Sequence, residues 1–69
     1  MNQELALSIG SKIKETRKNK SISQEHLALL TTIDRSYLWR IERGKVSITV
    51  EKLYQISQTL NVDPKTLLP

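Results

Sequence analysis

An apolar residue, a short polar residue, three further residues and a second apolar residue recur in this order four times along the chain. The four copies are Ile22-Ser23 with Leu27, Ile33-Asp34 with Leu38, Ile48-Thr49 with Leu53, and Val62-Asp63 with Leu67. Ser, Thr and Asp accept hydrogen bonds from the first free N–H groups of a helix, and the flanking apolar pair packs across the cap. The pattern therefore predicts helices that begin near residues 23, 34, 49 and 63.

A further helix is expected before the first of these starts. Leu5, Ile9 and Ile13 are spaced four residues apart and would form one buried stripe on a helix from about Gln3 to Lys18. No segment alternates apolar and polar residues for long enough to predict a strand, so the chain is expected to be all-α. No linker or low-complexity tract divides it, and residues 1–69 are predicted to form a single domain.

The two helices in the middle of the chain are short. The first would run from Gln24 to about Thr31. The next would end at Gly44, which can take the left-handed conformation that often follows a helix. The fourth helix has one apolar face and the final turn adds two leucines, the residues being Leu53, Ile56 and Leu60, then Leu67 and Leu68.

The composition limits what such a domain can do. A chain of 69 residues buries only about 60% of the surface that its unfolded form exposes, and this one has no cysteine for a disulfide. Its one histidine, His26, has no other metal ligands at suitable spacing, so no metal site and no cofactor are predicted. No nucleophile–base pair or paired carboxylates indicate an enzyme or a small-molecule substrate.

The sequence shows neither a membrane span nor a signal peptide. No apolar run approaches the ~18 residues that a transmembrane helix needs. The first residues, Met1 to Glu4, lack the basic start and the apolar stretch of a secretory signal. A cytoplasmic protein without membrane contact is the prediction.

Eleven Lys and Arg residues against seven Asp and Glu residues give a net charge of +4, which favours an anionic partner such as nucleic acid. Four acidic residues fall in predicted first turns, where the helix dipole stabilises them: Glu25, Asp34, Glu51 and Asp63. The basic residues Arg35, Arg40, Arg43 and Lys45 have no such explanation and cluster around the only tryptophan, Trp39. This segment is therefore the candidate binding surface.

Two short helices joined by three or four residues, the second with a basic outer face, indicate a helix-turn-helix, here over about residues 23–43. At about 100° per residue, Leu38 and Ile41 define the core face of the second helix, residues 34–43. Its outward face carries Ser36, Trp39, Arg40 and Arg43, with Arg35 on the flank. An α-helix fits the major groove of DNA, where an arginine can bond O6 and N7 of guanine together.

The segments Ser23-Gln-Glu-His-Leu-Ala28 and Asp34-Arg-Ser-Tyr-Leu-Trp-Arg-Ile-Glu-Arg-Gly-Lys45 resemble the phage repressor and Cro-type helix-turn-helix family, often called XRE-like. Ile9-Gly10, Ile13 and Arg17 resemble its first helix, and Leu60-Asn-Val-Asp63 resembles its junction into a fifth helix. The resemblance implies a compact five-helix lambda-repressor-like fold and a sequence-specific DNA-binding transcriptional regulator. The Asp34-Arg-Ser-Tyr37 start and the short chain also resemble the controller proteins of restriction-modification operons.

The resemblance also implies roles for individual residues. Contacts to bases would come from Arg35, Ser36 and Arg40, with Trp39 beside them. Contacts to the DNA backbone would come from Gln24, Tyr37, Arg43, Lys45, Ser47, Thr49 and Lys52. For Ser47 and Thr49 the alternative is helix capping alone, for Gln24 and Lys52 it is solvent exposure, and for Tyr37 it is a purely structural hydroxyl bond.

Two residues depart from the usual pattern of the family. Thr32 stands where the family often has glycine, and a positive φ there would strain a β-branched residue and reshape the turn. Trp39 is a large aromatic residue on the outward face. It would contact a thymine methyl group or the sugar-phosphate wall, or else pack against neighbouring arginines or a partner protein.

The family resemblance further implies a structural ion pair. Residues that match Arg17 and Glu42 pair between the first and third helices of the family. Arg17 continues the line of Ile9 and Ile13, and Glu42 flanks the core face of the third helix. A partly buried bidentate pair is therefore expected.

Apolar residues near the end of the chain suggest a homodimer, whose candidate interface residues are Tyr54, Leu60, Leu67 and Leu68. The alternative is that these residues complete the monomer core. A dimer would read double-stranded DNA at a pseudo-palindromic operator with half-sites about 34–36 Å apart. The competing functional hypothesis is a protein-interaction or antitoxin-like module of the same fold, with Trp39 and the spare leucines as its contact surface.

Overall fold

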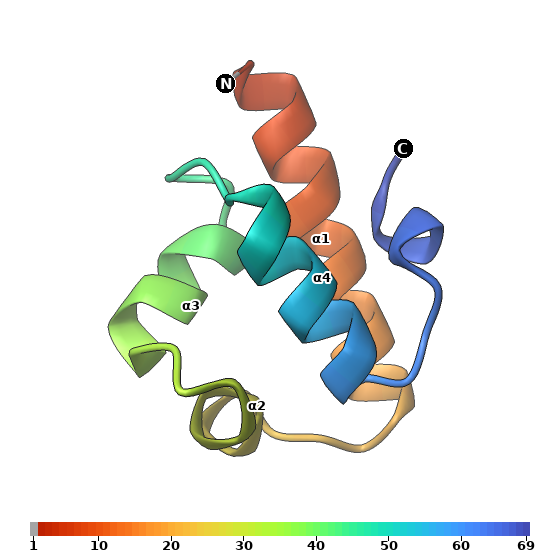
Figure 1. The fold of residues 1–69 in the computed structure, drawn as a ribbon. Coiled ribbons are helices and arrows are strands. Elements are labelled where there is room, and N and C mark those ends of the chain that lie inside the picture. The colour runs from red at the N-terminus through yellow and green to blue at the C-terminus, as the bar shows by residue number, and fades with distance from the viewer. Residues whose placement is uncertain (1) are drawn as a thin grey trace.

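The computed structural model describes residues 2–69, which form four α-helices and one short 3-10 helix (Figure 1). The elements are α1 Gln3–Asn19, α2 Gln24–Thr31, α3 Arg35–Glu42, α4 Val50–Thr59 and η1 Pro64–Leu67. Within this described part of the chain no residue lies in a strand, which confirms the all-α prediction. In the same part no helix is long and apolar enough to cross a membrane.

The prediction of five α-helices is wrong, because the last element is a single 3-10 turn. Its backbone bonds join residues three apart, from the Thr66 N–H to the Asp63 carbonyl at 2.8 Å and from the Leu68 N–H to the Lys65 carbonyl at 3.1 Å. A segment of four residues favours this tighter winding, which proteins use in short pieces.

All four predicted N-caps are present. Ser23, Asp34, Thr49 and Asp63 each accept a hydrogen bond from a backbone N–H two or three residues further along, at 2.9 to 3.2 Å. A fifth cap, Asn2, was not predicted and accepts from the Leu5 N–H at 3.2 Å. The helix starts therefore follow from local chemistry, with each cap satisfying a donor that the helix leaves free.

The helix ends share a second motif, in which one residue takes a left-handed conformation. These residues are Ser21, Thr32, Gly44 and Asn61, with φ of 58°, 54°, 70° and 57°. The N–H of the following residue then bonds a carbonyl five residues back, at 2.9 to 3.1 Å. At three of the four ends that residue, Ile22, Ile33 or Val62, is also the apolar residue before the next cap, so only three or four residues separate one helix from the next.

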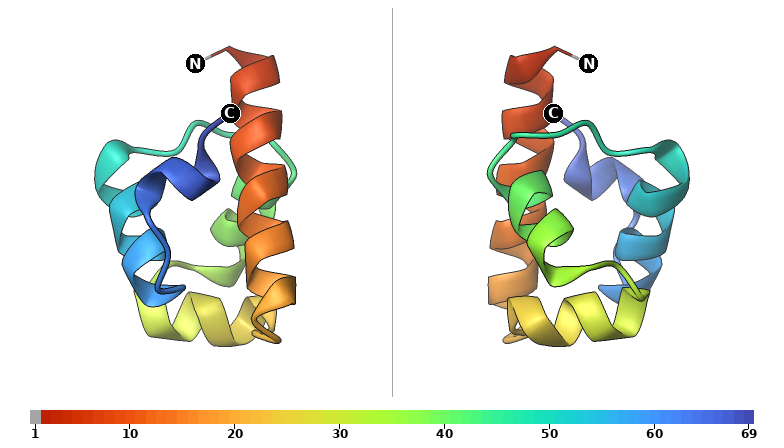
Figure 2. Two further views of the ribbon diagram at one scale, coloured as in Figure 1. Left: turned by 90° about the vertical axis from the view of Figure 1, so that its right-hand side faces the viewer. Right: turned by 90° about the vertical axis from the view of Figure 1, so that its left-hand side faces the viewer.

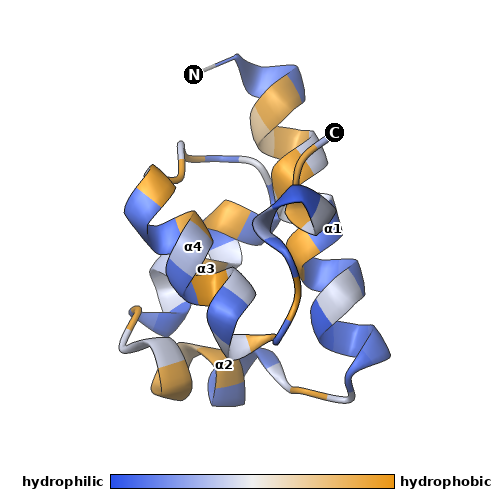
Figure 3. Ribbon diagram, turned by 45° about the vertical axis from the view of Figure 1, so that its right-hand side comes forward, coloured by the Kyte–Doolittle hydropathy of each residue, from blue (hydrophilic) through white to orange (hydrophobic). Residues whose placement is uncertain are grey.

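The helices enclose one core. In Figure 2, α1 and α4 stand at opposite sides of the molecule and α2 lies across one end. The turn η1 returns to contact both α1 and α4, and α3 packs against α1 and α2. Figure 3 shows apolar and polar residues alternating in bands along the helices, as expected of helices with one buried face.

The buried face of α1 differs from the predicted one. Leu5 is 38% exposed, whereas Ala6 is buried together with Ile9 and Ile13. Four residues make slightly more than one helical turn, so each residue in a series spaced four apart points about 40° further around the helix axis. A line of such residues therefore drifts away from the core. The buried face is centred on residues 6, 9, 10, 13 and 17, and this drift carries Leu5 to its edge.

Two of the predicted dimer residues lie in the core instead. Leu60 is 1% exposed and Leu67 is fully buried, because η1 folds back between α1 and α4 and inserts its last residue. Their assignment to a dimer surface is therefore wrong. Tyr54 and Leu68 remain exposed, at 52% and 39%.

Gly10 sits where α1 and α3 cross. A Cβ atom at this position would lie 2.8 Å from the Glu42 carbonyl oxygen and closer still to that of Ile41. These atoms belong to the backbone of α3 and cannot move aside without shifting the helix. Gly10 therefore lets the two helices approach closely, and it sets the distance at which α3 is held.

We predict that Gly10→Ala lowers the free energy of unfolding by about 1–3 kcal/mol, because the added methyl overpacks the crossing. Helix propensity alone predicts a gain of up to about 1 kcal/mol, so the two explanations differ in sign. Urea denaturation followed by circular dichroism measures the change. Ser11→Ala, at an exposed position on the same helix, is the control and should alter stability little. A Gly10→Ala variant as stable as the wild type would contradict the close crossing.

Candidate nucleic-acid interface

The turn between α2 and α3 is held from several directions. Thr32 has a φ of 54°, as its sequence position suggested, yet the Ile33 N–H still bonds the Ala28 carbonyl at 3.1 Å. The expected reshaping of the turn is therefore absent, because the helix-ending motif is the same as after α1 and α4. From α4, Gln55 Nε2 donates to the Thr31 carbonyl at 2.6 Å.

Arg17 and Glu42 form a buried, bidentate ion pair between α1 and α3. Arg17 Nε lies 2.8 Å from Glu42 Oε2, and Arg17 Nη2 lies 3.0 Å from Glu42 Oε1. The two side chains are 8% and 2% exposed. Such a pair offsets the cost of its burial only when its remaining polar atoms are also bonded.

Further hydrogen bonds supply those partners. Arg17 Nη1 donates to the Ile22 carbonyl at 3.0 Å, and Gln24 Nε2 donates to Glu42 Oε1 at 3.2 Å. Among residues 2–69 no buried side-chain nitrogen or oxygen lacks a hydrogen-bond partner. The network therefore joins the end of α1, the start of α2 and the end of α3, and it fixes how the two helices of the helix-turn-helix sit against the rest of the domain.

The outward face of α3 forms a shallow groove with the start of α2. Arg35, Ser36, Trp39, Arg40 and Gln24 line this groove, whose volume is about 440 Å³. The four α3 residues are exposed, whereas Leu38 and Ile41 on the opposite face are buried. The structure thus gathers the four predicted base-contacting residues on one surface.

Arg35 has one weak partner on this surface. Its Nη1 atom lies 3.6 Å from Glu25 Oε2, and both side chains are more than 60% exposed. An exposed pair of this length contributes less than about 1 kcal/mol. The guanidinium of Arg35 is therefore available to an anionic or hydrogen-bonding ligand.

Tyr37 is half-buried and holds two cations that come from different helices. The Arg40 guanidinium lies 5.8 Å from the centre of its ring, and Lys52 Nζ, from α4, lies 5.9 Å from the same centre. The Tyr37 hydroxyl donates to the Ser47 carbonyl at 3.4 Å. The Tyr37 side chain therefore connects α3, the following loop and α4. Its partners Arg40, Ser47 and Lys52 are all predicted DNA-contacting residues.

Trp39 makes a similar contact one turn along α3. The Arg43 guanidinium lies 5.1 Å from the centre of the indole ring, and Trp39 remains 43% exposed. The predicted packing on a neighbouring arginine is thus present. It covers part of the ring and leaves the rest open to a ligand.

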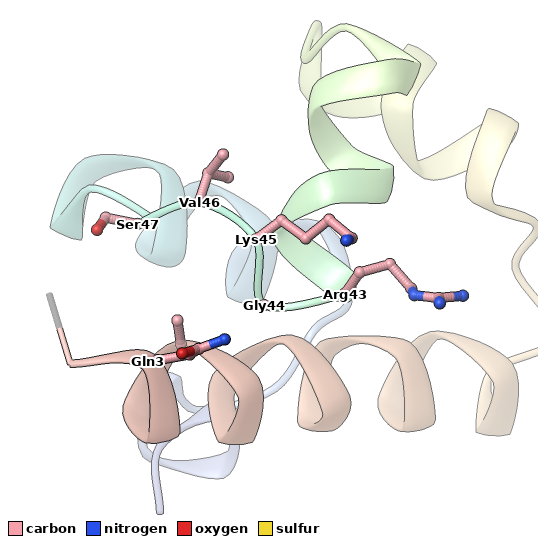
Figure 4. Close-up of a pocket in the computed structure, with 7 residues that line it drawn as sticks. Gln3, Arg43, Gly44, Lys45, Val46 and Ser47 are labelled. Atoms are coloured by element: carbon pink, nitrogen blue, oxygen red, sulfur yellow. The ribbon is translucent and has the colours of Figure 1, made fainter.

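The loop after α3 presents a second group of polar residues. Arg43, Gly44, Lys45, Val46 and Ser47 line an open cleft of about 510 Å³ together with Gln3 and Ala6 of α1 (Figure 4). In this view the side chains of Arg43 and Lys45 extend to the same side of the loop. Gly44 is required here, because a Cβ atom would lie 2.8 Å from the Leu7 Cα atom.

Some residues that were predicted to contact the DNA backbone already have hydrogen-bond partners within the protein. Thr49 Oγ1 caps α4, and Gln24 bonds Glu42, so each side chain is at least partly occupied. Sequence reasoning missed Gln3, which lies in the first turn of α1 across the cleft from Lys45. It also missed Gln55, because its partner Thr31 is 24 residues away and no local pattern marks such a contact.

Comparison with known proteins shows related regulators. Residues 10–69 match the model of a helix-turn-helix domain family. The chain is 38% identical over 69 residues to control protein C.BamHI of Bacillus amyloliquefaciens, covering 99% of this chain and 85% of that protein. It is 35% identical over 60 residues to control protein C.MunI of a Mycoplasma species, covering 86% of this chain and 81% of that protein.

A solved structure extends the likeness to three dimensions. The crystal structure of the restriction-modification controller protein C.AhdI from Aeromonas hydrophila is similar with a TM-score of 0.87 and 32% sequence identity. The similarity covers 91% of this chain and 96% of that chain.

We predict that Arg17→Ala and Glu42→Ala each lower the free energy of unfolding by about 3–5 kcal/mol, because each leaves a buried charge without its partner. The double variant should lose clearly less than the sum of the two single losses. Thermal and urea denaturation of the four proteins provide the double-mutant cycle. Arg35→Ala, which removes only the exposed pair with Glu25, is the matched control and should change stability by less than about 1 kcal/mol. Losses that simply add would contradict the coupling.

Proposed function

The chain belongs to the XRE-like helix-turn-helix family of DNA-binding transcriptional regulators, and from this premise we propose that it reads a pseudo-palindromic operator as a homodimer. In this proposal α3 lies in the major groove, and the start of α2 and the loop into α4 contact phosphates. The relatives named control proteins, together with the similar restriction-modification controller protein C.AhdI, favour the control of a restriction-modification operon as its task. The protein would then act in the cytoplasm and would catalyse no reaction.

The observation that supports this proposal best is the composition of the groove on α3. Arg35, Ser36, Trp39 and Arg40 line it together, and each except Trp39 has a side chain that pairs with base edges in the major groove. The opposite face of α3 is buried in the core, and the ion pair between Glu42 and Arg17 holds the C-terminal end of α3 against α1. A rigid helix that presents such a face is suited to reading bases, because little conformational entropy is lost on binding.

The remaining basic and polar residues flank this groove and would position the protein. Lys45, Ser47 and Lys52 lie on the loop after α3 and at the start of α4, and Arg43 is the C-cap residue of α3. Contacts from such residues to phosphates set orientation and carry no sequence information. We assign the same role to Gln24 and Thr49, whose side chains would add a DNA contact to their present bonds, and to the Tyr37 hydroxyl.

The size of the domain favours two copies on one operator. Its longest extent is 27 Å. Successive major grooves on one face of DNA are about 34–36 Å apart, so one copy spans less than that distance. Exposed Tyr54 and Leu68 offer apolar surface for a symmetric contact between copies.

We expect Arg35→Ala/Arg40→Ala to weaken binding to the DNA upstream of its own gene by roughly tenfold or more. Each arginine that bonds a guanine is worth about 1–3 kcal/mol of discrimination. Fluorescence anisotropy at two salt concentrations, with random duplex as competitor, measures both affinity and preference. Lys52→Ala is the control for a phosphate contact: it should weaken binding to all sequences alike and reduce the salt slope by about one.

Circular dichroism must show that the double variant is folded, which its exposed positions favour. A wild type that does not prefer the upstream DNA over random duplex would count against operator reading. It would favour the protein-interaction alternative instead.

For the dimer, we expect Tyr54→Gln/Leu68→Gln to raise the dissociation constant between copies about tenfold or more, since it removes the apolar contact surface without adding charge. Sedimentation analysis over a concentration series measures this constant. Leu29→Gln is the matched control, because Leu29 is a 73% exposed leucine on α2, away from the proposed contact. Equal dimerisation by the wild type and the double variant would place the dimer surface elsewhere.

A further inference from the structure

Trp39 is the one large apolar side chain on the groove-lining face of α3. It lies between residues that offer hydrogen bonds, with Arg35 and Ser36 before it and Arg40 directly after it. Residues 36, 39 and 40 share a helix face, since they are three and four positions apart. The indole therefore lies within the proposed base-reading surface and not at its border.

Arg43 holds the indole in this place. Arg43 is the C-cap residue of α3, four positions after Trp39, and its guanidinium stacks 5.1 Å from the ring centre. Stacking against one face restricts the rotation of both side chains before any ligand binds. The 43% of Trp39 that remains exposed is therefore an apolar surface of restricted mobility beside three hydrogen-bonding side chains.

The major groove presents one apolar group among its base edges. Guanine and adenine offer N7 together with O6 or N6, cytosine offers N4, and thymine offers O4 and its 5-methyl group. An indole ring packed against polar base edges alone would remove water from those edges without offering them hydrogen bonds in return, which is costly. The thymine methyl group is the partner that matches it in chemistry and position.

We infer that Trp39 is a specificity-determining residue, whose exposed ring packs against the 5-methyl group of one thymine in each half-site. The inference rests on the proposed function, since it requires α3 to lie in the major groove. Arg43 then acts as a positioning residue that holds the ring. The thymine lies next to the bases that Arg35 and Arg40 contact, because these side chains share one groove.

The test begins with a duplex that wild-type protein selects from a random pool. Failure to select any sequence over random duplex would overturn the proposed function itself, before Trp39 is considered. With a selected duplex in hand, each thymine of one half-site is replaced in turn by deoxyuridine. This change removes the 5-methyl group and keeps every hydrogen-bonding atom of the base.

For the wild type, one deoxyuridine position should weaken binding about fourfold, the effect of losing one buried methyl-sized group. For Trp39→Ala, thymine and deoxyuridine at that position should bind equally. Trp39→Phe, which keeps an aromatic ring, should retain part of the difference. Leu29→Ala, at an exposed leucine on α2, is the control and should show the full fourfold difference.

Two outcomes overturn the inference while leaving operator reading intact. One is a wild-type protein that is indifferent to deoxyuridine at every thymine. The other is a methyl effect that persists unchanged in Trp39→Ala and Trp39→Phe, since another side chain would then make the contact. Because the first outcome needs only wild-type protein, the inference stays testable even if a variant fails to fold.

Discussion

The buried ion pair between Arg17 and Glu42 sets the geometry on which the rest of the domain depends. It joins α1 to α3, and its further bonds to the Ile22 carbonyl and the Gln24 side chain reach the start of α2. Burying two charges is costly, and well-packed apolar residues often replace such a pair without loss of stability. Apolar contacts do not depend on direction, so apolar residues in these positions would not specify one orientation of α3 relative to α1. The fork of Arg17 meets Glu42 in one orientation, which fixes the position of α3.

Gly10, which lies on the same buried face of α1 as Arg17, adds a second constraint at this crossing. The ion pair sets the direction of α3 relative to α1, and the missing side chain at Gly10 sets how closely the two helices approach. With its inner face held in this way, α3 presents an outer face that has little freedom to adjust. Recognition surfaces of this kind bind with a small loss of conformational entropy.

Aromatic residues organise the cations on that outer face. Tyr37 lies against Arg40 and Lys52, and Trp39 lies against Arg43. Long basic side chains lose rotamer entropy when they bind a ligand. Stacking on an aromatic ring already restricts these side chains in the free protein, so less entropy is lost on binding. The two rings therefore do more than fill space, because they place charges from α3 and α4 within one surface.

The sequence by itself determined where helices begin, because a capping residue and its apolar neighbours act within five positions of one another. It also placed Arg35, Ser36, Trp39 and Arg40 on one face of α3, since helical periodicity is a local property. Only the tertiary structure decided that Leu60 and Leu67 belong to the core and that Gln55 holds the α2–α3 turn. Those outcomes depend on contacts between residues far apart in the chain, and no local pattern of apolar and polar positions specifies which distant surfaces will meet.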